Sequence, residues 1–72
     1  MTETRPIDVR LNGKDRQVAG GHTVRSLLES LDLVPGMVVV ELNREILQRD
    51  DYDDIRVSDG DTLELVHFVG GG

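Results

Sequence analysis

Residues 7–31 read IDVRLNGKDRQVAGGHTVRSLLESL, and this stretch decides the first half of the fold. It begins with Ile7, Val9 and Leu11 alternating with polar residues, which is the period of a strand with one buried face. Asn12-Gly13 follows, and this dipeptide favours a hairpin because both central residues of a type I′ turn need positive φ. We therefore predict a β-hairpin whose second strand, residues 14–19, is weakly patterned and lies at or near a sheet edge.

An amphipathic helix is predicted directly after the hairpin. Thr23 is a good N-cap, because its hydroxyl can accept a hydrogen bond from a free amide of the first turn. Ser26 stands where a capping box would have Glu or Gln, so we expect an incomplete box. Pro35-Gly36 closes the helical region. The residues that recur at helical spacing on one apolar face are Val24, Leu27, Leu28 and Leu31.

The second half of the chain contains three further strand candidates. Residues 37–42 are apolar and β-branched, as is typical of a central strand. Residues 46–48 are a short candidate, and residues 62–69 form the last strand. An acidic, irregular stretch at 49–54 and a tight turn at 58–61 separate them. The order ββαβ(β)β predicts an α+β domain with one helix packed on one face of a mixed, four- to five-stranded sheet.

Composition limits what this domain can do. With 72 residues it is one small domain that buries only about 60% of its unfolded surface, so its core is thin. The net charge of −6 argues against a nucleic-acid binder, which needs a basic face. Cysteine is absent, which excludes disulfides and thiolate chemistry and is compatible with a cytoplasmic protein. No apolar stretch approaches the roughly 18 residues of a membrane span, so we expect no membrane partner.

The usual signals of catalytic and metal sites are missing. His22 and His67 have no further ligand at metal spacing, so we expect no metal. His67, near the end of the last strand, reads either as a partner contact or as a cap on the core edge. The acidic residues at 50–54 do not match a calcium loop and read as a solvated loop. Gly20-Gly21 lacks the pattern of a phosphate-binding loop, and no serine has the context of a hydrolase, so we also expect no cofactor.

The end of the chain is its most unusual feature. The last strand runs directly into Gly70-Gly71-Gly72, which finishes in an α-carboxylate. Glycine has no Cβ, so such a tail is thin and can enter a slot that rejects other residues. A linker remnant or a frayed terminus is the alternative. We expect a single domain at residues 1–69 and a flexible tail at residues 70–72.

Several stretches together resemble the ubiquitin-like sulfur-carrier family, most closely its thiamine-biosynthesis branch. The resemblance covers essentially the whole chain, and no single stretch would suffice. The matching stretches are Leu11-Asn12-Gly13; Thr23-Val24 with Leu27-Leu28; Val40-Glu41-Leu42-Asn43-Arg44-Glu45-Ile46; Asp59-Gly60-Asp61; and His67-Phe68-Val69-Gly70-Gly71-Gly72. The resemblance implies the β-grasp (ubiquitin-like) fold.

The resemblance also implies a mechanism and partners. An adenylating enzyme of the ThiF type would use ATP to activate the carboxylate of Gly72. A persulfide donor would then supply sulfur, and the resulting thiocarboxylate would pass it to a thiazole synthase of the ThiG type. The chain would be a carrier and not an enzyme, with Gly72 as the reacting residue. The residues that would contact partners are Val66, His67, Phe68, Val69, Gly70 and Gly71.

Strand alternation supports part of this assignment. It places Leu63 and Leu65 towards the helix and Val66 and Phe68 on the opposite face, close to the tail. An apolar cluster beside a functional terminus is typical of an interface, although Phe68 could instead complete the thin core. Three other functions stay open: a sibling carrier for molybdopterin or cysteine synthesis, a ubiquitin-like modifier, and a plain interaction module.

Overall fold

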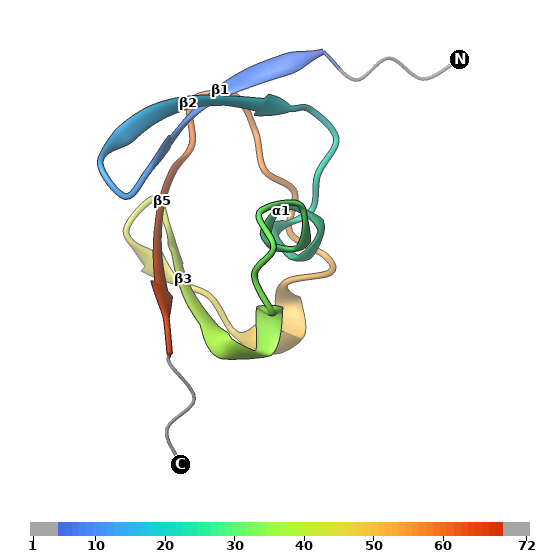
Figure 1. Ribbon diagram of the computed structural model, residues 1–72, viewed down its shortest axis with the longest axis vertical. Coiled ribbons are helices and arrows are strands. Elements are labelled where there is room, and N and C mark those ends of the chain that lie inside the picture. Colours follow the sequence, from blue (N-terminus) through green and yellow to red (C-terminus); the bar gives the residue numbers. More distant parts are fainter. Residues whose placement is uncertain (1–4, 69–72) are drawn as a thin grey trace.

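The computed structural model describes residues 5–68, which form a five-stranded sheet with one short helix packed against it (Figure 1). The strands occur in the order β2-β1-β5-β3-β4, so the last strand lies in the middle of the sheet. It runs parallel to β1 and antiparallel to β3, which makes the sheet mixed, as predicted. The elements are β1 (Pro6–Leu11), β2 (Lys14–Ala19), α1 (Val24–Ser30), η1 (Pro35–Met37), β3 (Val38–Leu42), β4 (Glu45–Ile46), η2 (Arg49–Asp51) and β5 (Thr62–His67).

The two hairpins use turns with positive φ at both central residues. Asn12 and Gly13 have φ of 50° and 81° and join β1 to β2, which is an edge strand, as predicted. The second hairpin joins β3 to β4 through Asn43 and Arg44, with φ of 51° and 73°. The predicted fourth strand is therefore misplaced, since β4 is Glu45–Ile46 and not residues 46–48. Its register is set by the two-residue turn.

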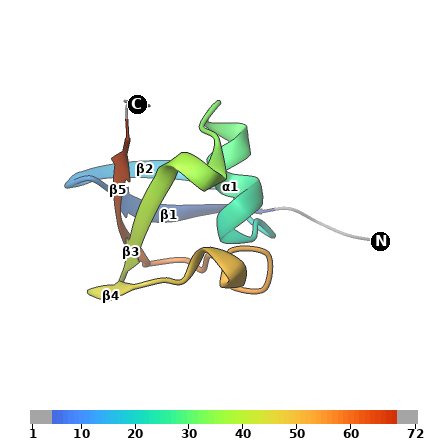
Figure 2. The ribbon, with the colours of Figure 1, turned by 90° about the horizontal axis from the view of Figure 1, so that it is seen from below.

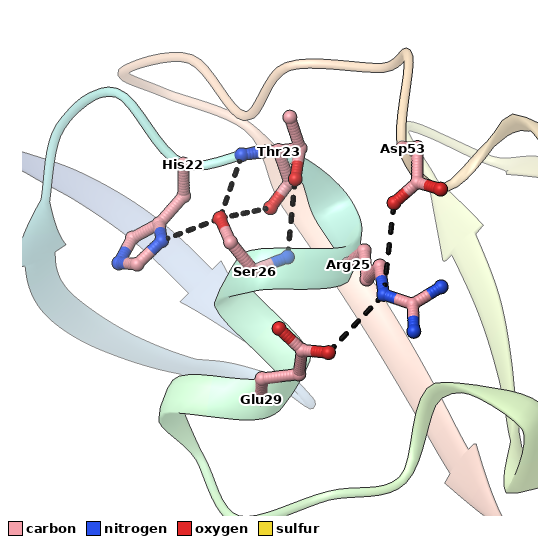
Figure 3. Close-up of polar contacts among 6 residues, drawn as sticks. All are labelled: His22, Thr23, Arg25, Ser26, Glu29 and Asp53. Atoms are coloured by element: carbon pink, nitrogen blue, oxygen red, sulfur yellow. Dashed lines mark hydrogen bonds and ion pairs between the residues drawn. The ribbon is translucent and has the colours of Figure 1, made fainter.

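The N-terminus of α1 has a complete capping box, so the prediction of an incomplete one is wrong. The Thr23 hydroxyl accepts the N–H of Ser26 at 3.1 Å, and Ser26 Oγ accepts the N–H of Thr23 at 2.9 Å (Figure 3). The box needs only an oxygen within reach of the N-cap amide, and a serine hydroxyl provides it here. His22 Nδ1 lies 2.8 Å from the same Oγ and shares in this network.

The helix ends at Ser30, and Asp32 beyond it takes a left-handed conformation with φ of 62°. Its N–H donates to Glu29, and the N–H of Leu33 donates to the carbonyl of Leu28. This is the pattern of a Schellman motif, which satisfies the last carbonyl groups of the helix. The motif places Leu31 and Leu33 beside the end of the helix, half-buried against the sheet.

The core lies between α1 and one face of the sheet (Figure 2). The sequence did not predict the burial of Tyr52, which belongs to the acidic stretch at 49–54. Its hydroxyl donates to the carbonyl of Val38 at 2.8 Å. This hydrogen bond offsets the free energy that burying an unpaired hydroxyl would cost. The buried residues are Val9, Leu11, Val24, Leu27, Leu28, Val38, Val40, Tyr52, Val57 and Leu63.

Candidate functional site

The start of β5 is held by the side chain of Asn43. Its Oδ1 accepts the N–H of Thr62 at 2.9 Å, and its Nδ2 donates to Asp61 Oδ1 at 3.0 Å. The other oxygen of Asp61 accepts the N–H of Ser58 at 2.7 Å. These contacts join the β3–β4 turn to the turn before β5. Two of the stretches that carry the resemblance therefore fix the position at which the last strand begins.

A second set of contacts ties the same turn to β1. Asp59 Oδ1 accepts the N–H of Asp8 at 2.8 Å, and the N–H of Gly60 donates to the carbonyl of Asp8 at 2.7 Å. Gly60 has a φ of 89°, which an L-residue with a side chain rarely adopts. The stretch Asp59-Gly60-Asp61 thus connects β5 to its neighbours on both sides.

Where β1 ends, the side chain of Asn12 becomes the hydrogen-bond partner of β5 in place of the strand. The Asn12 backbone N–H donates to the carbonyl of Leu63 at 2.9 Å, and Asn12 Oδ1 accepts the N–H of Leu65 at 2.7 Å. Pairing with β3 continues further, since the N–H of Phe68 donates to the carbonyl of Met37 at 2.8 Å. The end of β5 is therefore held from the β3 side up to the last residue that the structure describes.

The face of β5 that points away from the helix carries exposed apolar side chains. Val66 is 54% exposed and Phe68 48% exposed, so the predicted orientation of the strand is confirmed and Phe68 is not a core residue. Val39 lies directly opposite Val66 across the β3–β5 pair and therefore shares its face. We call Val39, Val66 and Phe68 the outer-face patch. Ile46, 70% exposed, lies on the same face in β4.

Two carboxylates lie next to the outer-face patch. Glu41 in β3 and Glu64 in β5 are directly opposite each other in the ladder, and neither forms an ion pair among residues 5–68. Like charges in directly opposed positions destabilise a sheet. A basic group on a partner that covers this face would remove the repulsion.

The remaining predicted site residues are divided between the other face and the undescribed terminus. His67 alternates with Val66 and Phe68, so it shares the helix-side face with Leu63 and Leu65, and it is exposed. Val69, Gly70, Gly71 and Gly72 lie outside the described residues, as does the predicted domain boundary after residue 69. Sequence reasoning missed Val39 and Ile46. Val39 lies in a run that is apolar on both faces, so only its pairing with Val66 identifies the exposed side.

In residues 5–68 no helix is long and apolar enough to cross a membrane. The same residues contain no group of three or more His, Asp or Glu side chains placed to hold a metal ion.

Comparison with known proteins gives consistent matches over nearly the whole chain. The model of the ThiS family matches residues 9–72. The sulfur carrier protein ThiS of Bacillus subtilis is 42% identical over 65 residues, covering 89% of this chain and 98% of that protein. The thiazole synthase of Paramagnetospirillum magneticum is 42% identical over 62 residues, covering 86% of this chain and 19% of that protein. The crystal structure of the thiamine biosynthesis protein ThiS from Geobacter metallireducens superposes with a TM-score of 0.77 at 39% identity, covering 92% of this chain and all of that one. The β-grasp fold is therefore confirmed.

Proposed function

The chain belongs to the ThiS family and is a sulfur carrier protein of thiamine biosynthesis, and we propose that it holds its sulfur on the α-carboxylate of Gly72. The observation that carries the proposal is the position of β5. This strand is central in the sheet, is anchored at its start by Asn43 and Asp61, and is followed directly in the sequence by the residues that end in Gly70-Gly71-Gly72. Because these contacts hold the start of β5 in place, a partner can recognise the strand in a fixed position and bind the residues that follow it.

The chemistry begins with the weakness of a carboxylate as an electrophile. The carboxylate of Gly72 attacks the α-phosphate of ATP, which forms an acyl-adenylate and releases pyrophosphate. Sulfur from a persulfide donor then displaces AMP, and cleavage of the S–S bond by a thiol leaves the thiocarboxylate. The carrier needs no cysteine for these steps, because the sulfur is held on the backbone terminus. Gly70 and Gly71 let that terminus enter the active sites of other proteins.

The partners in this proposal supply the catalytic groups, and the carrier itself is not an enzyme. One partner is an adenylating enzyme of the ThiF type, and the acceptor is a thiazole synthase of the ThiG type. The second assignment is supported by the thiazole synthase of Paramagnetospirillum magneticum, part of which is similar to this chain. We place the reaction in the cytoplasm. The outer-face patch and the neighbouring carboxylates Glu41 and Glu64 are proposed to contact these partners, since exposed apolar clusters mark interaction surfaces.

Changing the terminus tests the assignment of Gly72. Deleting Gly72, or adding one residue after it, should abolish ATP-dependent activation and leave the melting temperature unchanged. Pyrophosphate exchange with the adenylating enzyme and ATP measures this step. Gly36→Ala is the control, because its added Cβ meets nothing within 4 Å. Normal activation of either terminal variant would show that Gly72 does not carry the reaction.

A further inference from the structure

The last half of β5 has a backbone edge that no strand of residues 5–68 covers. β1 pairs with β5 only at Arg10↔Thr62 and Leu11↔Leu63, and the Asn12 side chain takes the next amide, that of Leu65. The N–H of Phe68 points towards β3, where it donates to Met37. Since the N–H and C=O groups of neighbouring strand residues point to opposite sides, those of His67 point away from β3. The groups of His67 therefore lie on a free edge, which is a site at which another strand can add.

A groove of about 860 Å³ lies along this edge, on the helix side of the sheet. It is bounded by the β1–β2 hairpin, by the residues that follow α1, and by β5 itself. Leucine side chains from each of these parts line it: Leu11, Leu31, Leu33 and Leu65. His67 lines it from the strand whose edge is free. An extended segment that paired with His67 would therefore place alternate side chains against an apolar surface.

The groove also has a local charge opposite to that of the whole chain. Lys14 and Arg16 oppose the buried residues Leu11 and Val9 across the hairpin, so both lie on the helix-side face. Neither forms an ion pair within residues 5–68. Two acidic residues line the groove. Asp15 forms an ion pair with Arg10 at 3.1 Å, and Asp32 is the lining acid without an ion pair among residues 5–68. With Asp15 paired, Lys14, Arg16 and Asp32 leave one net positive charge beside the apolar groove, which favours an acidic ligand although the whole chain has a net charge of −6.

We propose that this groove binds an extended, acidic segment of the adenylating enzyme, which is the first protein to receive the tail, and that the segment adds to β5 as a strand. The inference rests on the proposed function for the source of the segment. It follows from position: His67 lies at the end of the last strand, so a protein that takes the terminus lies close to the free edge. The groove is on the opposite side of β5 from the outer-face patch. The partner would thus contact both faces of the strand immediately before the tail.

The charge requirement is tested by reversing one groove cation. Arg16→Glu should weaken binding to the adenylating enzyme by about tenfold or more in Kd, measured by calorimetry. Arg49→Glu is the matched control, because Arg49 is exposed in η2, away from the groove, and the substitution changes the net charge equally. Equal affinities of the two variants for the adenylating enzyme would overturn the proposal.

The strand addition is tested at the backbone of His67. His67→Ala keeps the N–H, whereas His67→Pro removes it and places a ring at the free edge. The β3–β5 ladder does not use this N–H, so the proline is compatible with the fold. His67→Pro should bind the same enzyme about tenfold more weakly than His67→Ala, and equal binding would overturn strand addition. If His67→Pro has a much lower melting temperature than the parent, hydrogen exchange of the His67 amide is measured in the parent chain instead, with and without the enzyme. If the enzyme does not slow this exchange, strand addition is overturned.

Two controls separate this inference from the proposed function. Failure of the unmodified chain to become thiocarboxylated would contradict the proposed function. Normal thiocarboxylation together with parental affinities of Arg16→Glu and His67→Pro would contradict the groove alone. Sedimentation of the free chain identifies a competing occupant: a dimer that Arg16→Glu dissociates would mean that the groove binds a second copy, and the proposal would be wrong.

Discussion

Leu63 lies near the start of β5 and is completely buried, whereas Phe68 directly follows the end of the same strand and is 48% exposed. The difference extends to the backbone. The start of the strand is hydrogen-bonded on both sides, to β1 and to β3, whereas the end is bonded to β3 only. The first half of β5 thus belongs to the core, and the second half belongs to the surface at which we propose that partners bind. A carrier needs both, since its terminus must be presented from a position that does not move.

The largest expected effect comes from truncating one apolar residue in each half of the strand. Leu63→Ala should lower the free energy of unfolding by about 2–5 kcal/mol, because it leaves a cavity in the core. Phe68→Ala should lower it by about 1 kcal/mol or less, because half of the residue is already in water. Urea denaturation measures both. Phe68→Ala should instead weaken binding to the two enzymes, and a stability loss as large as that of Leu63→Ala would contradict the division of β5.

An intermediate effect on stability is expected for Asn43, whose side chain holds the first half of β5 in place. Asn43→Ala removes the two side-chain hydrogen bonds to Thr62 and Asp61 and places alanine at a φ of 51°. The free energy of unfolding should fall by about 2–3 kcal/mol. Asn43→Gly loses the same bonds without the backbone strain, so it should cost about 1 kcal/mol less. Thermal unfolding of the pair checks this, and identical melting temperatures would mean that the positive φ is not strained.

The smallest expected effect is a gain in stability beside the outer-face patch. Glu64→Gln removes the repulsion with Glu41 and should raise the free energy of unfolding by about 0.2–1 kcal/mol. The same substitution should weaken binding to a partner that offers a basic group there. Glu45→Gln is the control, since it changes the net charge equally and lies opposite Leu42. If Glu45→Gln stabilised the chain as much as Glu64→Gln, the gain would come from net charge and not from this pair.

Much of the architecture is readable from local patterns. The strand of Ile7, Val9 and Leu11 and the apolar face of the helix depend on short-range periodicity, and the Asn12-Gly13 turn depends on residues that accept positive φ. All three are present in the structure. The order of elements then leaves few ways to arrange the sheet. The family resemblance predicted the function, because the chemistry that we propose takes place at the chain terminus and not on a set of side chains.

The features that were missed depend on tertiary structure. Tyr52 stands in an acidic stretch without periodicity, so nothing local indicates its burial. Val39 shares a face with Val66 and Phe68 only because β5 pairs with β3 in one register. The free edge at His67 arises because β1 ends at Leu11, opposite Leu63, so the two strands overlap only at the start of β5, and no sequence pattern encodes this register. The capping box is the one local feature that was wrongly predicted: Ser26 completes it in place of Glu or Gln, because any well-placed oxygen suffices.

The mass of the C-terminal fragment after reaction tests the central claim most directly. The unmodified chain is incubated with the adenylating enzyme, ATP and a persulfide donor, and the C-terminal fragment is then analysed. We expect a gain of about 16 Da confined to the fragment that ends in Gly72, which corresponds to one oxygen replaced by sulfur. An unchanged mass in the presence of active enzyme and donor, or a gain located elsewhere in the chain, would contradict the assignment of Gly72 as the sulfur-carrying residue.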